Sequence, residues 1–550
     1  MKKKIFAFFL CLLILCIPTV QAQAENDSPW YYEIRDGGVF ILNYRGDHGG
    51  HVEIPATIDG KPVTGIGNSA FLGRKLSSVT IPDTVTQIVD AAFAHCPNLS
   101  TVNLSENVTV IDGSAFMDCE SLTGIWVDPQ NPAYTSDDQG VVYTKNERTL
   151  VQAPGALEGE YVIPDGVIEI GHSAFQGCWK LTKITIADSV RHIDGYAFCD
   201  CSGLTRLAIP ALVESIGLHA FTRCSKLTGI DVAKENRFYC SDESGNLYNQ
   251  DKSQILYGAG AFTGDYVVPQ GTTQIGNSFF NGASGLTSVT IPEGVTFIGH
   301  YAFHDCENLE SVTIAQSVRD IDGYAFQHCP KLTKVNIPAQ MTHIQWGLFC
   351  GCESLTQLPI HNQVKIIDDY AFQSCHGLTD IIIPASVEYV GHYAFQGCRG
   401  LKNVYFCGDA PEFVNHENIN GSFADTAANA YYHKGTEGWT AENMSKTGGY
   451  ITWNELEHIV FDEGPDARCV VCGEKAQKNT TVDGAVYRAQ LVSDETTDVP
   501  TIQNPPTTQN PPTEDNPKTK DRIIHIAGIV LILVTAGFWL TLKLWRCDKQ

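Results

Sequence analysis

The stretch IDGYAFQHCPKLTKVNIP, residues 321–338, contains the pattern that decides the fold. In it, an Ala-Phe pair is followed by a cysteine three residues after the phenylalanine and by a leucine six residues after it. Valine and isoleucine then stand nine and eleven residues after the phenylalanine, the period-two spacing of a β-strand. The stretch also sets His328 beside Cys329, the two residue types that a thiol nucleophile and its base would need.

The phenylalanine of this pattern recurs along the chain. Successive copies are 22, 23, 59, 23, 23 and 59 residues apart, and then 23 residues apart five times. The twelve copies are Phe71, Phe93, Phe116, Phe175, Phe198, Phe221, Phe280, Phe303, Phe326, Phe349, Phe372 and Phe395. One 23-residue unit cannot enclose a core, whereas stacked units can. The sequence therefore predicts a β-rich solenoid of about twelve coils.

The two intervals of 59 residues each contain one repeat plus an insertion of 36 residues, near 128–163 and 233–268. Each insertion reads as loop, strand, turn, strand, as in GVVYTKNERTLV (140–151) and GNLYNQDKSQILY (245–257). This pattern predicts a β-hairpin that either projects from the stack or pairs along its side.

The repeat I-G-x-x-A-F-x-x-C-x-x-L-x-x-V-x-I-P resembles the BspA-like leucine-rich repeats of bacterial surface proteins. YYEIRDGGVFILNYRG (31–46) with VEIPATIDGKPVTGIGNSAF (52–71) resembles the N-terminal cap of that family, and VYFCGDAPEF (404–413) with GTEGWT (435–440) resembles its closing region. The resemblance spans residues 30–453. It implies a leucine-rich-repeat solenoid with a binding or adhesion role at a cell surface.

Cysteine stands three residues after the phenylalanine in ten of the twelve repeats, whereas the residue before that cysteine varies. A catalytic nucleophile is needed once, so we interpret the ten cysteines as buried packing groups and His328 as a solvated turn residue. A disulfide framework is the alternative in an exported protein. Reduced thiols are favoured because stacked side chains point in parallel and runs of three and five cysteines leave odd thiols. Cys199 and Cys350 are expected to face outward.

A second column is aromatic and lies two residues before the phenylalanine. It contains Tyr196, Tyr301, Tyr324, Tyr370 and Tyr393. These tyrosines are our candidate ligand surface, because an aromatic row can stack on protein or glycan. The alternative is that they only pack on one another. His172, His300 and His392 come three residues before the phenylalanine, where they serve as turn residues or tune binding by protonation.

Both ends of the chain indicate export and anchoring. Residues 1–24 have the basic start, apolar run and Ala-x-Ala end of a signal peptide, and residues 521–550 contain an apolar run, 523–542, followed by a basic tail. The Pro-, Thr- and Asn-rich residues 493–520 read as an extended spacer. NPKTK (516–520) resembles a cell-wall sorting signal, which would be cleaved after Thr519 and joined to peptidoglycan; a retained single-pass membrane anchor is the alternative.

The remaining boundaries follow from these patterns. We expect an N-terminal β cap at 25–66, the solenoid at 67–407, a C-terminal cap at 408–457 and a small segment at 458–492. That small segment contains Cys469 and Cys472, whose C-x-x-C spacing fits a disulfide-closed turn or, with His458, part of a zinc site.

Composition narrows the function. The chain has 62 acidic and 37 basic residues and a formal net charge of −25, which disfavours nucleic acid and anionic lipid as partners. No non-repeated constellation stands out, so no catalytic residue and no cofactor is expected. The sequence predicts a surface protein that binds or adheres to host proteins, glycans or other microbes. A structural envelope spacer and, less favoured, a surface hydrolase are the alternatives.

Overall fold

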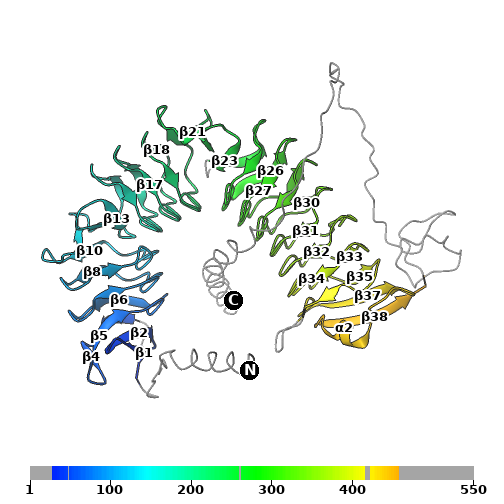
Figure 1. Cartoon of the computed structure of the whole chain (residues 1–550), viewed down its shortest axis with the longest axis horizontal. Helices are drawn as coiled ribbons and strands as arrows, with labels where there is room; N and C mark the ends of the chain where they lie inside the picture. Colours follow the sequence, from blue (N-terminus) through cyan, green and yellow to red (C-terminus); the bar gives the residue numbers. More distant parts are fainter. Residues whose placement is uncertain (1–27, 47–48, 259–261, 415–420, 458–550) are drawn as a thin grey trace, which may run out of the picture. The chain divides into compact units, whose positions relative to one another are not determined.

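The computed structural model describes residues 28–46, 49–258, 262–414 and 421–457, all within one compact unit. The chain winds into stacked coils whose successive strands lie side by side (Figure 1). Each coil has three sides: a first ladder of longer strands, a second ladder of short strands, and a turn face. We define the turn face as the residues from four before to three after the repeat phenylalanine. The predicted leucine-rich-repeat solenoid is confirmed.

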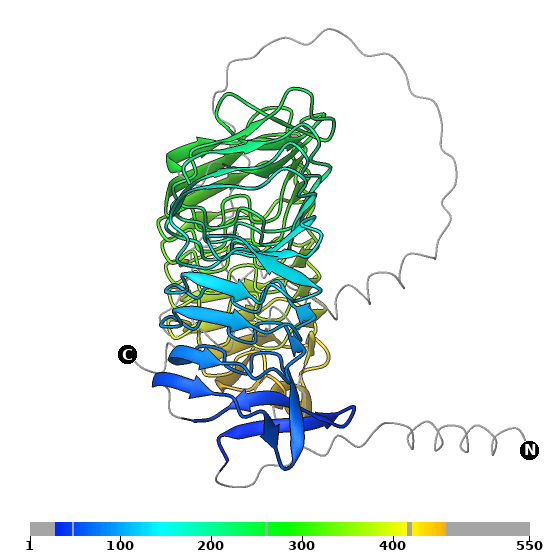
Figure 2. The same ribbon diagram turned by 90° about the vertical axis from the view of Figure 1, so that its left-hand side faces the viewer.

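The first ladder holds the strands that contain the residue nine after the phenylalanine in every coil but that of Phe349, together with strands of the two ends and of the insertions. They pair in parallel within short sheets, and Figure 2 shows those of the first coils lying one above another. The strands are β3(Gly49–Glu53), β6(Lys75–Thr80), β8(Thr101–Leu104), β10(Gly124–Val127), β14(Gly159–Val162), β16(Leu181–Thr185), β18(Leu207–Ile209), β20(Ile230–Val232), β24(Thr263–Val267), β26(Gly285–Ile291), β28(Ser311–Ile314), β30(Lys334–Val335), β33(Asp380–Ile383), β35(Asn403–Phe406), β37(Ala427–His433) and β38(Tyr450–Leu456).

The second ladder was not foreseen as strand, although its apolar residues were part of the repeat. It too is parallel, and most of its strands have two residues. The strands are β2(Gly38–Tyr44), β5(Lys61–Ile66), β7(Gln87–Ile88), β9(Val110–Ile111), β13(Thr149–Gln152), β15(Glu169–Ile170), β17(His192–Ile193), β19(Ser215–Ile216), β23(Gln254–Tyr257), β25(Gln274–Ile275), β27(Phe297–Ile298), β29(Asp320–Ile321), β31(His343–Ile344), β32(Ile366–Ile367), β34(Tyr389–Val390) and β36(Glu412–Phe413).

Irregular elements complete both ends. At the N-terminal end, β1(Trp30–Arg35) pairs antiparallel with β2, and β4(Thr57–Ile58) pairs antiparallel with β5. At the other end, the helix α2(Ala441–Ser445) connects β37 to β38, and the side chain of Thr440 caps it by accepting the backbone N–H of Asn443. Among the described residues, no helix is long and apolar enough to cross a membrane.

Each insertion pairs along the side of the stack, the second of the two predicted alternatives. In the first, β11(Tyr134–Ser136), β12(Val142–Thr144) and β13 form an antiparallel meander, and β13 continues the second ladder through parallel pairing with β15. In the second, β21(Tyr239–Ser241), β22(Leu247–Asn249) and β23 repeat this arrangement. The predicted hairpin is therefore present with two further strands: β11 or β21 before it, and β14 or β24 of the first ladder after it. The apolar core divides at these insertions into three clusters.

A column of stacked phenylalanine rings forms the centre of the core. Eleven of the twelve repeat phenylalanines are less than 2% exposed, and Phe221 is 5% exposed. Within each block of coils between the insertions, neighbouring rings lie 4.7–5.7 Å apart between centroids and within 4–18° of parallel. Tyr44 stacks on Phe71 at one end of the column, and Phe423 stacks on Phe395 at the other. Phe423 follows Phe395 by 28 residues, so the 23-residue register did not reveal it.

The repeated cysteines are buried and free, as predicted, but they also donate hydrogen bonds. Cys329 Sγ lies 3.0 Å from the carbonyl oxygen of Phe303 in the preceding coil, and Cys306 Sγ lies 3.1 Å from that of Phe280. A small thiol fits in the core beside the ring column and meets the remaining acceptor of a buried carbonyl. Cys329 is thus a packing group, and His328 is not its catalytic partner.

The backbone of the turn face explains which residues occupy it. In the coil of Phe303, the N–H groups of Tyr301, Phe303 and Asp305 donate to the next coil at 3.4, 2.7 and 3.0 Å. The N–H groups between them, of Ala302 and His304, donate back within the coil at 3.2 and 3.1 Å. To alternate in this way, the chain takes positive φ two residues before and two residues after the phenylalanine.

Positive φ is found after the phenylalanine in all twelve coils and before it in eleven. A residue other than glycine pays about 1 kcal/mol or more for this conformation. The residues two after the phenylalanine are Gly73, His95, Asp118, Gly177, Asp200, Arg223, Gly282, Asp305, His328, Gly351, Ser374 and Gly397. The residue type two after the phenylalanine therefore varies because the backbone there needs only a positive φ, which glycine and several other residue types adopt.

Phe326→Ala is expected to destabilise its part of the stack by about 3–5 kcal/mol, because it leaves a cavity inside the ring column. His328→Ala should lower the free energy of unfolding by less than about 1 kcal/mol, and His328→Gly by less still, because glycine adopts the φ of +56° without strain. Denaturant unfolding of the three variants measures the difference. Equal losses for Phe326→Ala and His328→Ala would contradict the assignment of the inward face.

Candidate functional site

The five tyrosines of the candidate ligand surface lie on the turn face and are all half-buried. Tyr301 and Tyr324 stack with centroids 5.3 Å apart, and Tyr370 and Tyr393 stack at 5.5 Å. Tyr196 instead stacks on His219 at 4.8 Å. The structure thus brings the tyrosines together in two pairs and one Tyr–His pair. Whether they contact a ligand stays a prediction.

The hydroxyls of Tyr196, Tyr301 and Tyr324 stay protonated at neutral pH. Burial is the main cause that raises the pKa of Tyr301 to about 12, and it also raises the pKa of Tyr196 and Tyr324. These hydroxyls can therefore donate hydrogen bonds over the physiological range.

A pocket of about 290 Å³ opens beside the Tyr301–Tyr324 pair. Its lining consists of His300, Asp322, Gly323, Tyr324, Gln345, Trp346 and Asp368. His300, Gly323 and Trp346 occupy the same position, three before the phenylalanine, in three successive coils. A Cβ at Gly323 would lie 3.0 Å from the Trp346 carbonyl oxygen and 3.7 Å from His300 Cε1. The pocket exists because Gly323, which has no side chain, lies between the large side chains of His300 and Trp346.

The pocket coincides with a break in the repeat. Coils before and after read GYAF (323–326) and DYAF (369–372), whereas this coil reads WGLF (346–349). Gly347 takes the place of a tyrosine, and a Cβ there would lie 2.3 Å from the Tyr324 ring. Trp346 is 40% exposed and donates a hydrogen bond to Asp368. Sequence reasoning missed this site, although Trp-Gly at an otherwise regular position was a visible signal.

Burial shapes the charge of the pocket. It is the first cause of the raised pKa of Asp368 and of the lowered pKa of His300. His300 is therefore neutral at pH 7, although the nearby Asp322 opposes the shift. The pocket combines aromatic rings, a neutral imidazole and two carboxyl groups.

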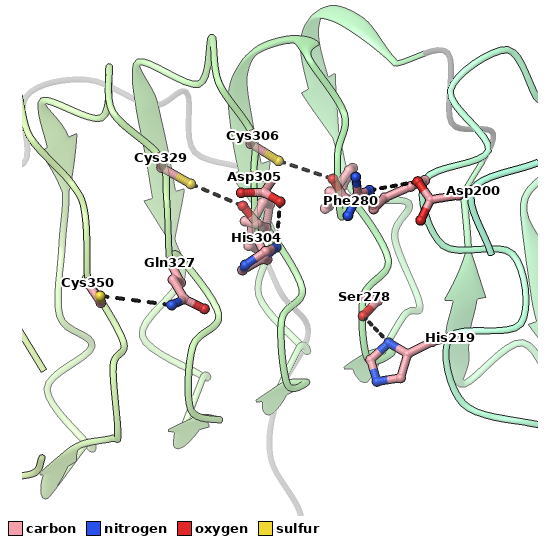
Figure 3. A network of polar contacts seen from close by, with 12 residues as sticks. Asp200, His219, Ser278, Phe280, His304, Asp305, Cys306, Gln327, Cys329 and Cys350 are labelled. Carbon is pink, nitrogen blue, oxygen red and sulfur yellow. Dashed lines mark hydrogen bonds and ion pairs between the residues drawn. The ribbon is translucent and has the colours of Figure 1, made fainter. Parts of the chain in front are cut away.

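A row of polar side chains runs beside the tyrosines, one residue after each phenylalanine (Figure 3). Gln327 Nε2 lies 3.9 Å from Cys350 Sγ, which lies 3.3 Å from Gln373 Oε1. Gln373 Nε2 then donates to Gln396 Oε1 at 2.6 Å. The sequence analysis had not foreseen these hydrogen bonds between coils.

The prediction that Cys199 and Cys350 face outward is wrong. They are 5% and 6% exposed, because the residue after each phenylalanine is covered by its counterparts in the adjacent coils. Cys199 Sγ lies 3.5 Å from Asp200 Oδ2, and burial raises the pKa of this thiol well above its ordinary value. Neither cysteine has the exposure of a reactive thiol, and the raised pKa of Cys199 is the opposite of what such a thiol needs.

The prediction that the residue two after the phenylalanine is solvated is also wrong for the charged members of that column. His95 Nε2 lies 3.7 Å from Asp118 Oδ2, and Arg223 Nε lies 2.9 Å from Asp200 Oδ1 (Figure 3 shows the Asp200 pair). The Asp118 side chain is only 16% exposed, and that of Asp200 is 24% exposed. Neighbouring coils cover these turns and pair their charges.

Two of these carboxyl groups, those of Asp118 and Asp200, have raised pKa values. Burial raises the pKa of Asp118 from 3.8 to about 6, against the hydrogen bond from Gln176 Nε2 at 3.1 Å. Burial likewise raises the pKa of Asp200 to about 6, against the attraction of Arg223. Both carboxylates are held by side chains of the stack itself. We interpret them as part of the fold, and within the described ranges no group of three His, Cys, Asp or Glu side chains is arranged to hold a metal ion.

The remaining predicted sites lie outside the described residues. These are Cys469 and Cys472 of the C-x-x-C segment and Thr519 of the sorting-like motif. The predicted signal peptide, spacer and anchor at 1–24, 493–520 and 521–550 also lie there.

The segments that match a known protein family coincide with the repeated coils. The model of the BspA type leucine-rich repeat region matches residues 52–137, 159–243 and 266–409, more than half of the chain, in six copies. The chain belongs to the BspA-type leucine-rich repeat family. The intervals between the matched segments contain β12 and β13 in one case and β22 and β23 in the other, so the insertions are additions to the BspA-type repeat.

Several solved structures are similar to this BspA-type protein. A leucine-rich cell surface protein from Faecalibacterium prausnitzii A2-165 is 26% identical, with 71% of this chain and 95% of that chain covered and a TM-score of 0.40. A leucine-rich repeat protein from Eubacterium ventriosum ATCC 27560 is 20% identical over 72% and 93% of the chains, with a TM-score of 0.42. The pneumococcal vaccine antigen PcpA is 19% identical over 79% and 99%, with a TM-score of 0.38. No curated protein matches the chain.

Membership of the BspA-type family indicates the general class of function. BspA-like proteins are typically bacterial cell-surface proteins, and leucine-rich repeat proteins are generally binding proteins without enzymatic activity. Leucine-rich repeat surface proteins bind proteins or other ligands.

Asp118→Asn should stabilise the protein at pH 7 by roughly 2–3 kcal/mol, because the folded state raises the carboxyl pKa from 3.8 to about 6 and so disfavours the charged form. The stability that Asp118 contributes is complete below pH 3.8 and is lost as pH rises through 6. When pH falls from 7 to 5, the free energy of unfolding should therefore rise less for the variant than for the wild-type protein.

Denaturation midpoints at both pH values measure this effect. Asp83→Asn is the matched control, because Asp83 is exposed and the substitution removes the same charge from the surface. A lower midpoint for Asp118→Asn than for Asp83→Asn at pH 7 would contradict the account.

Proposed function

We propose that this protein is displayed on the bacterial surface and binds an extracellular macromolecule through its turn face, at the pocket around Trp346. The observation that carries the proposal is the coincidence of three features. The repeat breaks at Trp346-Gly347, the pocket opens there, and an indole ring is 40% exposed beside the stacked tyrosines. Tryptophan and tyrosine are the residues most enriched at the energetic centres of protein interfaces.

The first ladder is a less suitable binding surface. Its outward residues include Thr80, Thr185, Thr290 and Thr313, which are exposed, small and uncharged. These threonines supply hydrogen bonds but neither charge nor large apolar area. Trp126, Val162 and Val267 are exposed apolar residues of the same ladder, each on a different strand. On the turn face, by contrast, Asp322, Asp368, Tyr324 and Trp346 line one pocket.

The anchoring part of the proposal rests on the sequence. In this proposal, residues 1–24 direct export, residues 521–550 hold the chain in the membrane, and 493–520 act as an extended spacer that precedes the anchor in the sequence. Cys469 and Cys472 form a disulfide-closed turn or part of a zinc site. Cleavage after Thr519 with transfer to peptidoglycan is the alternative mode of attachment.

Fractionation of cells distinguishes the two modes. With a retained membrane segment, purified peptidoglycan freed of membrane by hot detergent contains none of the protein. Protein that leaves the peptidoglycan only after digestion of the wall would instead show sortase-type attachment, and Thr519→Ala should then move it to the membrane fraction.

The binding function is tested with the secreted part, residues 25–480, on a panel of host proteins and glycans. Trp346→Ala should weaken capture of the bound partner at least tenfold, since exposed aromatic residues at a binding pocket contribute about 2 kcal/mol or more. Replacement of Tyr301, Tyr324 and Tyr393 together with serine should abolish capture. Biolayer interferometry measures both effects.

Trp126→Ala is the matched control, because Trp126 is also 40% exposed but lies on β10 of the first ladder. Equal losses for the two tryptophan variants would place binding elsewhere. Absence of any partner would favour the structural-spacer function, and turnover of a panel member would favour the hydrolase.

A further inference from the structure

The pocket at Trp346 has a definite charge character. Asp322 and Asp368 contribute its two acidic groups, and none of its seven lining residues, all in the described part of the chain, is lysine or arginine. Asp322 Oδ1 accepts the N–H of Gly323 at 2.7 Å, and Asp368 Oδ1 accepts the N–H of Asp369 at 3.0 Å. Both carboxyl groups are thus oriented by the backbone of the turn face at the walls of the pocket.

Burial is the main cause of the raised pKa of Asp368, and the charge of the neighbouring Asp369 adds to it. Hydrogen bonds from the backbone N–H of Asp369 and from Trp346 favour the ionised carboxylate, as does the smaller attraction of His343. A ligand that brings a positive charge would favour the ionised form further, whereas a neutral ligand would not. An anion would meet two carboxyl groups and a chain of net charge −25.

The aromatic lining favours the same ligand. Tryptophan and tyrosine rings attract a cation placed over their faces, and the attraction is stronger where the cation is shielded from water. Trp346 and Tyr324 line the pocket together with the two carboxyl groups. Aromatic faces and carboxylates in one small cavity are complementary to an ammonium or guanidinium group on an apolar stem.

We propose that this pocket binds the side chain of a lysine or arginine residue of a partner protein. The proposal rests on the proposed function and names its partner class: a protein with an exposed basic residue. The stem of the basic side chain lies over Gly323 between His300 and Trp346, and its charged end meets Asp322 and Asp368. A volume of about 290 Å³ accommodates one such side chain.

The test uses the whole chain labelled with 5-fluorotryptophan and ¹⁹F NMR. The chain has 8 tryptophans, and Trp346→Phe assigns the resonance of Trp346. The probes are Nα-acetyl-lysine amide and Nα-acetyl-arginine amide, with Nα-acetyl-norleucine amide as the matched probe that has the stem of lysine without its charge. N-acetylglucosamine tests a glycan ligand.

We expect the two basic probes to shift the Trp346 resonance in a saturable way and the two neutral probes to leave it unchanged. Asp322→Asn with Asp368→Asn should weaken the basic probes at least tenfold while the other tryptophan resonances, which report on the fold, stay in place. A shift of equal size with norleucine amide, or saturation by N-acetylglucosamine alone, would overturn the proposal.

The outcome is separable from the proposed function. Loss of partner capture on Trp346→Ala without a response to basic probes keeps the binding site but rejects its specificity for a cation. A response to basic probes with unchanged partner capture rejects the turn face as the docking surface and leaves the cation site standing.

Discussion

The backbone hydrogen bonds of the turn face constrain the whole structure. In eight of the twelve coils, every second N–H around the repeat phenylalanine donates to the next coil, so three hydrogen bonds per coil hold this side of the stack in register between the insertions. The geometry requires positive φ on both sides of the phenylalanine, and glycine, tyrosine, histidine, serine, aspartate and arginine all adopt it here. The stacked rings then fill the space that these turns enclose. Side chains on the turn face are therefore placed by the backbone with the spacing of the coils.

This constraint explains why cysteine is so frequent beside the ring column. The carbonyl of most repeat phenylalanines already accepts an N–H within its own coil, as Phe303 does from Cys306 at 3.3 Å. The thiol of the next coil approaches the same oxygen from inside the stack, as Cys329 does at 3.0 Å. The interior has space for a side chain of this size and offers one weak acceptor, a combination that suits a thiol. Repetition of the cysteines thus follows from packing and hydrogen bonding.

The insertions and the pocket are two different departures from regularity. Each insertion adds strands to the second ladder and separates the apolar core into blocks, so it changes the stack without opening the turn face. The exchange of Gly-Tyr for Trp-Gly at 346–347 leaves the backbone ladder intact, with the N–H of Gly347 donating to Asp369 at 2.9 Å. It changes only which side chains project. A binding site can therefore be built on this scaffold by side-chain substitution alone.

The sequence alone determined the solenoid, its twelve phenylalanines and the burial of the cysteine column, because a fixed period leaves one way to bury the repeated apolar residues. It also predicted a hairpin in each insertion from two short β-runs around a turn. It did not reveal that Cys199 and Cys350 are buried, nor that Asp118 and Asp200 are covered, because those positions vary and their burial comes from neighbouring coils. The tyrosine column was visible in the sequence, but its division into pairs was decided by His219 and Gly347, which occupy the same column. The pocket at Trp346 depends on His300, Gly323 and Asp368, which are up to 68 residues apart and meet only when the coils stack.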